Sequence, residues 1–462
     1  MKTIQVATKY VLVLIVMVFC STSCTEKKTK TINNSEKSQP NIILIMADDL
    51  GYGELSCYGS TKISTPNIDQ LAAEGVKLTD FHSNGPLCSP TRAALMTGKY
   101  QQRTGVEGVI TAKSHREVGL SLDETTIAEL LKAEGYFCGM YGKWHLGYAE
   151  AFNPTYQGFD EFTGFVGGNI DYHSHVDQEG YLDWWKNKVI DNEEGYTTDL
   201  ITKHGVEFIK KYNSNKTGKP FFLYLSQEAP HYPIQGRNDA PVREVGNKKY
   251  IRKVLNDSIQ SIYISMIETM DEGVGEIVNA VKEEGLFENT IIVFCSDNGA
   301  VGKRGDNGVL RDSKASVYEG GHRVPAIITY SGKIKPGIVN NTPVMSMDFL
   351  PTFVEFANEK TTVNNIDGVS IKNMLLQNEA IAERDLFWKF RGRIAVRSGK
   401  WKLVTLYLAE EGERINHLFN LETDLSEKYN VAKDHPELVS ELLDKIEKWQ
   451  KDVYKGVDMV AE

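Results

Sequence analysis

Hydrophobic and polar positions along the chain form two alternating kinds of segment. Four short apolar runs, at 41–47, 136–145, 220–225 and 290–294, have the composition of strands that are buried on both faces. Between these runs lie segments with apolar residues at helical spacing, as over 262–281. This alternation of strand and helix predicts an α/β fold, in which helices cover both faces of a large, mostly parallel sheet.

Capping residues mark two of the predicted helices. Thr65 is expected to cap a helix that ends at Gly75, because threonine is favoured at the N-cap and glycine just beyond the last turn. Ser121 and Glu124 resemble a capping box for a second helix, which ends at Gly135. Both helices follow a predicted strand or lead to one, as an α/β fold requires.

The N-terminal segment has the pattern of an export signal. Lysines precede an apolar run at 10–19, which is too short to span a bilayer and has the proportions of a secretory signal. Cys24 follows small residues, which resembles a bacterial lipoprotein signal with Cys24 as the lipidated first residue; Cys20 and a plain cleaved signal are the alternatives. We therefore expect a signal peptide at 1–24, a flexible polar tether at 25–39, and an exported protein that is periplasmic or anchored to the outer membrane by lipid.

Composition narrows the class of protein. The chain of 462 residues is 41% hydrophobic, so it can bury a large core. Its formal net charge is −10 and no block of lysine and arginine occurs, which argues against a nucleic-acid partner. Beyond the signal, the cysteines are Cys57, Cys88, Cys138 and Cys295, and none has the spacing of a metal-binding pair. A disulfide between residues 57 and 138, or between 138 and 295, stays open.

Each of the four apolar strands is followed by groups that can bind a metal or transfer a proton. These groups are Asp48 and Asp49 after the first strand, Lys143 and His145 at the second, His231 after the third, and Asp297 and Asn298 after the fourth. Taken singly, each also fits an ordinary turn or surface position. Because open α/β sheets bind ligands at the carboxyl ends of their strands, we expect these side chains to converge at one edge of the sheet.

The expected cluster combines oxygen donors with cations. Asp48, Asp49, Asp297 and Asn298 offer oxygen ligands without a nearby histidine or cysteine, which suits Ca²⁺ better than zinc, with Mg²⁺ as the alternative. The groups that carry a positive charge or a proton are Arg92, Lys143, His145, His231 and Lys314. Such a site favours an anion whose charge must be held while a bond breaks.

Cys88 stands at the start of a predicted helix, with Pro90 in its first turn and Gly98 at its end. The positive end of a helix dipole binds anions and lowers the pKa of a thiol. The residues alone therefore leave two interpretations open, a thiolate nucleophile and an inert buried thiol.

Two segments resemble the signatures of a known enzyme family. The stretch 88–98, CSPTRAALMTG, resembles the first signature of the type I sulfatases, and 142–147, GKWHLG, resembles the second. The resemblance extends in order over about residues 40–325 through NIILIMADDLGYG, APHYP, SDNG and YEGGHRVP. The chain is thus identified as similar to type I sulfatases of the alkaline phosphatase superfamily, which are sulfuric ester hydrolases.

The resemblance implies a role for each residue of the cluster. In this family a maturation enzyme converts the cysteine at position 88 to formylglycine, and Arg92 holds the new group. The implied ligands of one Ca²⁺ ion are Asp48, Asp49, Asp297, Asn298 and the modified Cys88. Lys143 and Lys314 would stabilise the sulfate, His231 with Lys314 would protonate the leaving group, and His145 would take a proton from the second hydroxyl of the hydrate. The segment around Lys314 lacks the glycines that we would expect on either side of it.

The resemblance also implies the domain organisation and the substrate class. It implies a catalytic domain at 40–345 and a C-terminal subdomain at 346–462, made of a small antiparallel sheet plus a helix. The amphipathic stretch at 436–453 is expected to form this helix. It implies an aryl sulfate or a sulfated glycan as substrate, of the galactose or N-acetylgalactosamine type. Candidate residues for a sugar subsite are His173, His175, Trp388, Lys389 and Arg391. For the two histidines, a metal site and a loop without a role in substrate binding are the alternatives. The alternatives are a phosphatase or phosphodiesterase of the same superfamily, and a glycan-binding lipoprotein without catalytic activity.

Overall fold

The computed structural model describes residues 39–252, 258–408 and 413–461. The predicted signal at 1–24, with Cys20 and Cys24, and the predicted tether up to residue 38 lie outside these residues. Among the helices of the described part, none has the length and apolar character needed to cross a membrane.

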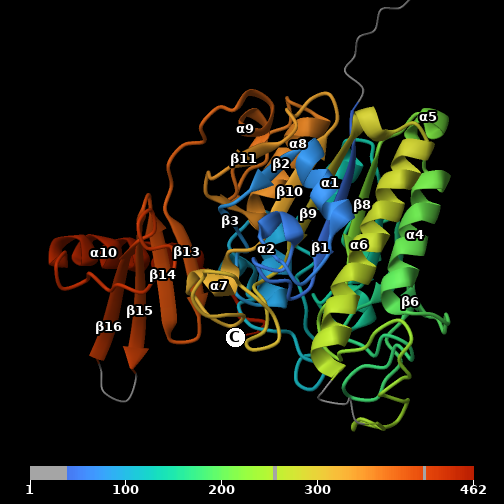
Figure 1. The fold of residues 1–462 in the computed structure, drawn as a ribbon, viewed down its shortest axis with the longest axis horizontal. Helices are drawn as coiled ribbons and strands as arrows, with labels where there is room; N and C mark the ends of the chain where they lie inside the picture. The colour runs from blue at the N-terminus through green and yellow to red at the C-terminus, as the bar shows by residue number, and fades with distance from the viewer. Residues whose placement is uncertain (1–38, 253–257, 409–412, 462) are drawn as a thin grey trace, which may run out of the picture. The chain divides into compact units, whose positions relative to one another are not determined.

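A ten-stranded mixed sheet forms the centre of the fold (Figure 1). Its strands, in spatial order, are β11 (Ile338–Asn340), β2 (Val76–Leu78), β10 (Ala326–Tyr330), β9 (Thr290–Ser296), β1 (Asn41–Ala47), β8 (Phe221–Ser226), β4 (Phe137–Lys143), β5 (Glu161–Phe165), β6 (Trp185–Lys186) and β7 (Val189–Ile190). The strands from β9 to β5 run parallel to one another. The four predicted strands are therefore β1, β4, β8 and β9, which lie side by side, and the predicted fold class is confirmed.

Helices cover both faces of this sheet. On one face lie α1 (Pro66–Glu74), α4 (Thr197–Lys211) and α6 (Ile259–Glu283), and α4 and α6 run alongside each other in Figure 1. On the other face lie α2 (Cys88–Thr97), α3 (Ile127–Ala133), α8 (Phe349–Ala357) and α9 (Lys372–Gln377). Each face of the sheet thus has its own hydrophobic core.

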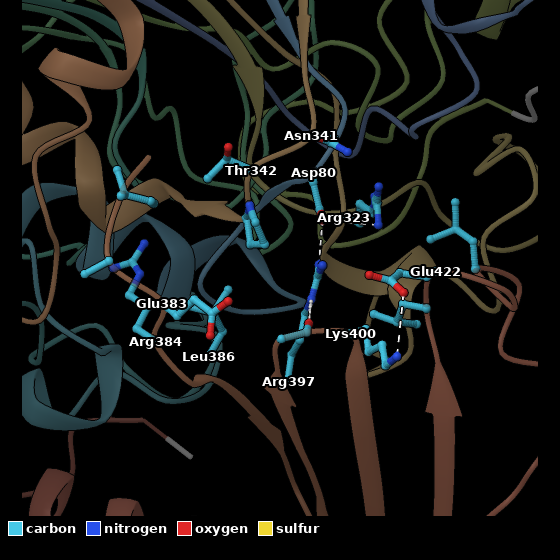
Figure 2. A pocket seen from close by; sticks show the side chains of 16 residues that line it. Asp80, Arg323, Asn341, Thr342, Glu383, Arg384, Leu386, Arg397, Lys400 and Glu422 are labelled. Carbon is cyan, nitrogen blue, oxygen red and sulfur yellow. Dashed lines mark hydrogen bonds and ion pairs between the residues drawn. The ribbon is translucent and has the colours of Figure 1, made fainter. Parts of the chain in front are cut away.

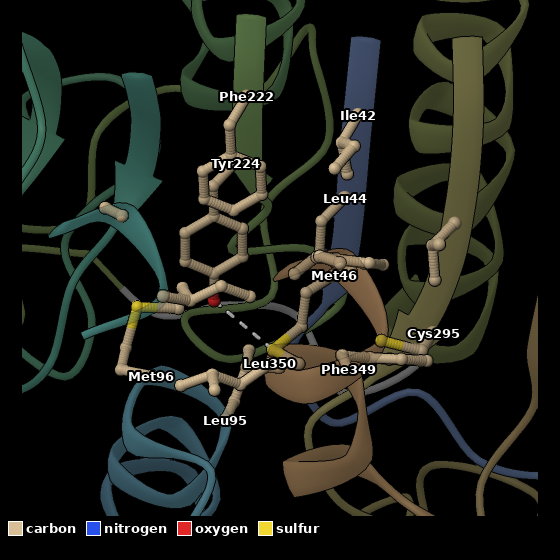
Figure 3. Close-up of a cluster of buried hydrophobic side chains, with 14 of the residues drawn as sticks. Ile42, Leu44, Met46, Leu95, Met96, Phe222, Tyr224, Cys295, Phe349 and Leu350 are labelled. Atoms are coloured by element: carbon tan, nitrogen blue, oxygen red, sulfur yellow. Dashed lines mark hydrogen bonds between the residues drawn. The ribbon is translucent and has the colours of Figure 1, made fainter. Parts of the chain in front are cut away.

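Strand β1 shows how the sequence supplies both cores. Successive side chains of a strand point to opposite faces, so an uninterrupted apolar run fills two cores at once. Ile42, Leu44 and Met46 pack on the face of α2 and α8 (Figure 3), whereas Ile43 and Ile45 pack on the face of α6. All five side chains are at most 1% exposed. The central strands are therefore held rigidly, together with the loops that follow them.

The C-terminal part forms a second, antiparallel sheet of four strands. Its strands are β13 (Leu386–Phe390), β14 (Arg393–Ser398), β15 (Trp401–Leu408) and β16 (Glu413–Asn420). Helix α10 (Pro436–Val453) packs on this sheet through Leu442, Ile446 and Trp449. The predicted antiparallel sheet plus helix is therefore confirmed, and α10 coincides with the predicted amphipathic stretch. The division at residue 345 stays a prediction, since α8 and α9, which follow it, pack in the core of the ten-stranded sheet.

The predicted capping box is wrong. Helix α3 begins at Ile127, and its capping box is formed by Thr126 and Glu129 instead of Ser121 and Glu124. The Thr126 hydroxyl accepts from the backbone N–H of Glu129, and the Glu129 carboxylate accepts from the N–H of Thr126. Both pairs fit the sequence signature of a capping box. Only Thr126 and Glu129 stand directly before the apolar positions that face the core.

Thr65 occupies the N-cap position of α1, but its side chain does not cap the helix. Its hydroxyl instead lies 3.2 Å from Oγ of Ser56 and 3.1 Å from Oδ1 of Asp69, and it can donate to either of them. The helix start therefore depends on Pro66, whose missing N–H needs no partner in the first turn.

The cysteines of the described residues are all free. Cys138 and Cys295 are buried in the core and Cys57 is half-buried. Neither the bridge between 57 and 138 nor the bridge between 138 and 295 forms.

Candidate active site

The loops that follow β9, β1, β8 and β4 meet at the carboxyl edge of the sheet. Asp48 and Asp49 follow β1, Lys143 is the last residue of β4, and Asp297 follows β9. Each of these side chains is buried. The structure thus brings together the groups that the sequence placed at four separate strand ends, because these strands are parallel neighbours.

Cys88 is the first residue of α2 and lies in the middle of this cluster. Its Sγ atom is 3.4 Å from Oδ1 of Asp48 and 3.2 Å from Nζ of Lys314. Burial, followed by the charge of Asp297, raises the pKa of the Cys88 thiol well above its usual value. Burial thus outweighs the helix dipole at this position, which favours the buried-thiol interpretation over the thiolate nucleophile.

The oxygen donors of the cluster are arranged for a cation. Ligand atoms of Asp48, Asp49, Cys88 and His231 all lie within 4.8 Å of one another. Asn298 donates from Nδ2 to Oδ1 of Asp49 over 2.7 Å, which turns its Oδ1 toward the site. Within the described residues, Oδ1 of Asn298 and Oδ2 of Asp49 are buried and accept no hydrogen bond. Because buried oxygens without a partner are costly, these two oxygens fit a hard divalent cation.

Three ion pairs hold the charges of the site. Lys143 lies 2.6 Å from Asp48, Lys314 lies 2.5 Å from Asp49, and Arg92 lies 2.8 Å from Asp297. Burial, together with the nearby Asp297 and Asp49, raises the pKa of Asp48 to about 7 despite the Lys143 charge. With all three carboxylates ionised, the three cations balance them. A bound divalent cation, which also favours ionised Asp48, would then leave the site positive and attractive to an anion.

Backbone strain occurs at two of these positions. Asp49 and His145 adopt left-handed φ angles of 68° and 60°, which are uncommon for residues other than glycine. Such strain persists where the surrounding structure over-determines a conformation, and it clusters at functional sites. Oδ1 of Asp49 lies 4.0 Å from Sγ of Cys88, and His145 lines the same cavity as Cys88.

The two histidines of the site present an unprotonated nitrogen to it. Nε2 of His145 lies 3.0 Å from the carbonyl oxygen of Ile110, which can only accept, so Nε2 carries the proton. Nδ1 of His145 is then a buried acceptor that has no partner in the described structure. Likewise, Nδ1 of His231 donates to the carbonyl of Tyr232 over 2.8 Å, while its Nε2 lies 3.6 Å from Oδ2 of Asp49. Burial lowers the pKa of both side chains, that of His231 to about 3.

A cavity of about 620 Å³ opens onto this cluster. Cys88, His145, His231 and Lys314 line its inner end. Further lining residues, which sequence reasoning missed, are Thr111, Tyr148, Asn169, Gln178 and Tyr232. Asn169 follows the glycine pair at 167–168. Adjacent glycines indicate a place where the backbone passes close to other groups, so this pair could have pointed to the segment beside the site.

The predicted sugar-subsite residues lie elsewhere. His173 stacks against Tyr196, and His175 stacks against Trp184 with ring centroids 4.6 Å apart. Trp388 is fully buried between the two sheets, Lys389 bonds to Glu107 and Tyr454, and Arg391 is exposed at a turn. The structure therefore brings none of the five to the cavity, and no cavity-lining residue comes from the described part of 346–462.

A second cavity, of about 420 Å³, lies between the ten-stranded sheet and the C-terminal sheet (Figure 2). Its arginines are held by buried carboxylates: Arg323 and Arg397 contact Asp80, and Arg384 contacts Asp348. These pairs give the arginines a structural role, and none of the predicted catalytic or metal-binding residues lies here.

Comparison with known proteins identifies the family. Residues 40–359 match the model of the family described as Sulfatase. The chain belongs to the type I sulfatases. Residues 310–452 of this sulfatase also match the model described as N-sulphoglucosamine sulphohydrolase, C-terminal.

Relatives of the sulfatase include human arylsulfatase A, at 34% identity over 400 residues that cover 79% of this chain and 74% of the relative. Mouse N-acetylgalactosamine-6-sulfatase is 32% identical, covering 79% of this chain and 71% of the relative. Among solved structures, Ps i-CgsB superposes with a TM-score of 0.80 at 33% identity, covering 91% of this chain and 95% of the other. The sulfatase is therefore a sulfuric ester hydrolase, related to enzymes that act on carbohydrate sulfates.

Proposed function

We propose that this sulfatase hydrolyses sulfate esters of carbohydrates with a formylglycine residue made from Cys88 and with one Ca²⁺ ion. The position of Cys88 carries the proposal. Its Sγ lies between a lysine and two carboxylates at the inner end of the cavity, yet its raised pKa makes the thiol itself a poor nucleophile. A modified side chain at this position resolves that conflict.

A formylglycine-generating maturation enzyme is the implied partner, and it would oxidise the Cys88 side chain to an aldehyde. The hydrate of this aldehyde supplies a hydroxyl nucleophile and a second hydroxyl, whose deprotonation allows sulfate to leave. Arg92 is too tightly engaged to move: it donates to Asp297, to the Lys143 carbonyl and to Ser226. It thereby fixes the start of α2 against β4, β8 and β9.

Asp48, Asp49, Asp297, Asn298 and residue 88 would hold the calcium ion. When bound, the ion supplies positive charge that acidifies a hydroxyl and binds the sulfate. The unpartnered oxygens of Asp49 and Asn298 support this assignment. A set of oxygen ligands drawn entirely from the protein favours Ca²⁺ over Mg²⁺, which usually keeps several of its waters.

Lys143 and Lys314 hold the sulfate oxygens in this proposal. Both ammonium groups stay charged, because burial is outweighed by Asp48 at Lys143 and by Asp49 at Lys314, which raises both pKa values. Positive groups fixed around the place where negative charge develops stabilise the transition state without reorganising.

In this proposal, His231 and Lys314 protonate the oxygen of the leaving group. His231 is neutral beside the two lysines, but a bound sulfate anion would raise its pKa and favour a proton on Nε2. Lys314 already carries a proton. His145, with its free Nδ1 acceptor, takes the proton of the second hydroxyl of residue 88.

A carbohydrate fits the cavity better than a plain aryl group. The outer cavity is lined by polar groups such as Thr111, Ser114 and Gln178, together with the ring of Tyr232. Aromatic faces and hydrogen-bonding side chains suit a polyhydroxylated ring. Relatives that are N-acetylgalactosamine-6-sulfatases support a galactose or N-acetylgalactosamine sulfate.

Mass spectrometry of the peptide that contains residue 88 tests the chemistry. Protein from a host with the maturation enzyme should carry an aldehyde there and should hydrolyse sulfated galactose or N-acetylgalactosamine, and Cys88→Ala should not. An unmodified thiol in active protein would refute the mechanism. Faster hydrolysis of matched phosphate esters would indicate the phosphatase alternative, and binding of sulfated glycans without turnover by aldehyde-bearing protein would indicate a binding protein.

We also propose export with a lipid on Cys24, the signal at 1–24 and the tether at 25–39, with catalysis assigned to 40–345. The sequence pattern alone supports these assignments. Labelling with a radioactive fatty acid should mark the wild-type chain and not Cys24→Ala. A label that persists in Cys24→Ala, or none in either chain, would contradict the anchor.

A further inference from the structure

Asn169 is a cavity residue whose backbone is fixed on both sides. Gly168 donates its N–H to the hydroxyl of Tyr148 over 3.1 Å, and Ile170 donates its N–H to Oε1 of Glu228 over 2.7 Å. Asn169 itself is 6% exposed and lines the same cavity as Cys88. Its side chain therefore has a set direction with respect to a bound substrate.

Gly168 brings this segment against the proposed base. A Cβ atom at position 168 would lie 2.7 Å from Nε2 of His145, so a side chain there would force the imidazole to move. Glycine is thus the residue that lets the chain pass at this distance. Asn169, the next residue, lines the same cavity as His145.

A buried arginine determines which end of the Asn169 amide faces the cavity. Nη2 of Arg243 donates to Oδ1 of Asn169 over 2.7 Å, and its Nη1 donates to the carbonyl of Val176 over 3.2 Å. Arg243 is 3% exposed, and its backbone N–H is held by Asp171. A guanidinium can only donate, so it holds the amide oxygen toward itself and leaves the NH₂ group pointing away.

The NH₂ group of Asn169 is a donor available to a ligand. No residue in the described part of the chain accepts a hydrogen bond from Nδ2, and this atom is not among the fully buried polar atoms that lack a partner. A fixed donor of this kind in a substrate cavity selects for ligands that present an acceptor oxygen.

We propose that Asn169 is a specificity residue that donates from Nδ2 to a sugar oxygen near the sulfate ester, and that Arg243 is its positioning residue. The inference rests on the proposed carbohydrate sulfatase function. A sugar carries ring, hydroxyl or acetamido oxygens one or two carbons away from the carbon that bears the ester, whereas a simple aryl sulfate has only C–H groups there. Asn169 thus distinguishes sulfated sugars from aryl sulfates.

Binding to a Cys88→Ala background tests this inference without turnover. Calorimetry is run with 4-nitrophenyl sulfate and with the tightest binder among galactose 6-sulfate and the 4- and 6-sulfates of N-acetylgalactosamine. Adding Asn169→Ala should raise Kd for the sugar about tenfold, or about 1.4 kcal/mol, and Kd for the aryl sulfate less than about threefold. Equal weakening of both ligands, no weakening, or no binding of any sulfated sugar would overturn the inference.

Matched variants separate recognition from folding. Asn192 is an exposed asparagine, and Asn192→Ala should leave both Kd values unchanged. If Asn169→Ala lowers Tm, Asn169→Leu is the second variant. It keeps the branched shape of the asparagine side chain without its polar atoms, and it should show the same loss of sugar binding. Turnover by Cys88→Ala would refute the proposed mechanism and would leave the Kd comparison valid.

A double-mutant cycle tests the positioning role of Arg243. Arg243→Gln frees the Asn169 amide to turn, so sugar binding should weaken about threefold while Asn169 is present. In the Asn169→Ala background the same change should have no further effect, because residues that act through one contact are not additive. Additive losses would show that Arg243 acts independently of Asn169 and would overturn its assignment.

Discussion

At the scale of single residues, the unpartnered oxygens of Asp49 and Asn298 predict that calcium stabilises the protein. Calcium binds the folded site and not the unfolded chain, so it should raise Tm of protein stripped with EDTA. At a concentration of 100 times Kd, the gain is about 2.7 kcal/mol. Differential scanning calorimetry over a calcium titration measures this gain.

Asn298→Ala is the informative variant for the calcium prediction, because it removes a neutral ligand and leaves all three ion pairs of the site in place. We expect it to shift the titration to higher calcium concentration. Magnesium should give a smaller rise of Tm than calcium at equal concentration. An unchanged Tm in wild type, or the same titration in Asn298→Ala, would argue against the assigned site.

Lys314 gives a second prediction at this scale. Its Nζ lies 3.2 Å from Cys88 Sγ, so Lys314→Met removes a positive group from the place where sulfate charge develops. We expect kcat to fall about 10²–10³-fold, as for the loss of one stabilising donor. The exposed Lys333→Met is the matched control and should keep its rate. A less than tenfold loss for Lys314→Met in steady-state assays would remove Lys314 from the catalytic set.

The neighbours of Lys314 show what sequence reasoning gained and lost at this scale. The sequence predicted that Lys314 lies at the site, although the glycines that we expected on either side of it are missing. The structure keeps the lysine at the site, and Asp312 and Ala315 take left-handed φ angles of 68° instead. Residue type and order were thus enough to find charged groups at strand ends. Asn169 was missed, because its role depends on a loop conformation and on Arg243, which no local pattern reveals.

At the scale of elements, the start of α3 gives a third prediction. Thr126→Ala removes the cap and also the bond from its hydroxyl to the carbonyl of Gln157. The free energy of unfolding should fall by about 1–2 kcal/mol. Ser121→Ala, in the pair that the sequence wrongly favoured, should change it by less than about 0.5 kcal/mol. Urea denaturation of the two variants decides between the pairs, and equal effects would contradict the structural assignment.

Elements with long periodic or continuous apolar patterns could be predicted, and the others could not. Strand β1 and helix α10 match their predicted bounds because burial sets the pattern along their whole length. Helix α4 was not predicted from the sequence. It contains Gly205, and a glycine inside a helix lowers helix stability by about 1 kcal/mol relative to alanine, so the local sequence does not favour a helix there. A Cβ there would lie 2.8 Å from Ile277, so the glycine serves close packing on α6. That reason exists only in the folded structure.

At the scale of the whole described molecule, a buried polar chain joins the two sheets. Nζ of Lys402 lies 3.0 Å from Nε2 of His322, the Nδ1 atoms of His322 and His82 are 3.0 Å apart, and Nε2 of His82 is 2.8 Å from Asp80. With Lys402 donating and Asp80 accepting, neutral histidines that each have one N–H and one acceptor satisfy these three contacts. Nε2 of His322 also lies 3.2 Å from the Val317 carbonyl, and Nε2 of His82 lies 3.3 Å from Nη1 of Arg397. Trp388 stacks on His322 with centroids 4.0 Å apart. The sequence could not predict this contact, because its members come from distant segments.

The row of hydrogen-bonded side chains from Lys402 to Asp80 predicts that acid destabilises the contact between the two sheets. Burial lowers the pKa of His82 and His322 below the usual value of 6.5, so only the unfolded chain takes up these protons as the pH falls past 6.5. Stability is therefore lost toward acid pH. Charged groups around the histidines are Asp80, Glu319, Arg323, Arg397, Lys402 and Glu427. Burial raises the pKa of Glu427 to about 7, and its proton uptake in the folded state acts in the opposite direction.

His322→Gln isolates the histidine contribution, because glutamine keeps one donor and one acceptor but does not titrate. Glu427 and the active-site carboxylates are the same in both proteins, so their effects cancel in the difference. From pH 6.5 to 5.5, the wild type should lose about 1 kcal/mol more stability than the variant, since one buried histidine must stay neutral. Urea denaturation at both pH values, with calcium held constant, measures this difference. Parallel loss in the two proteins would mean that protonation of His322 does not control the junction, whereas the predicted difference would identify it as the acid-sensitive contact between the sheets.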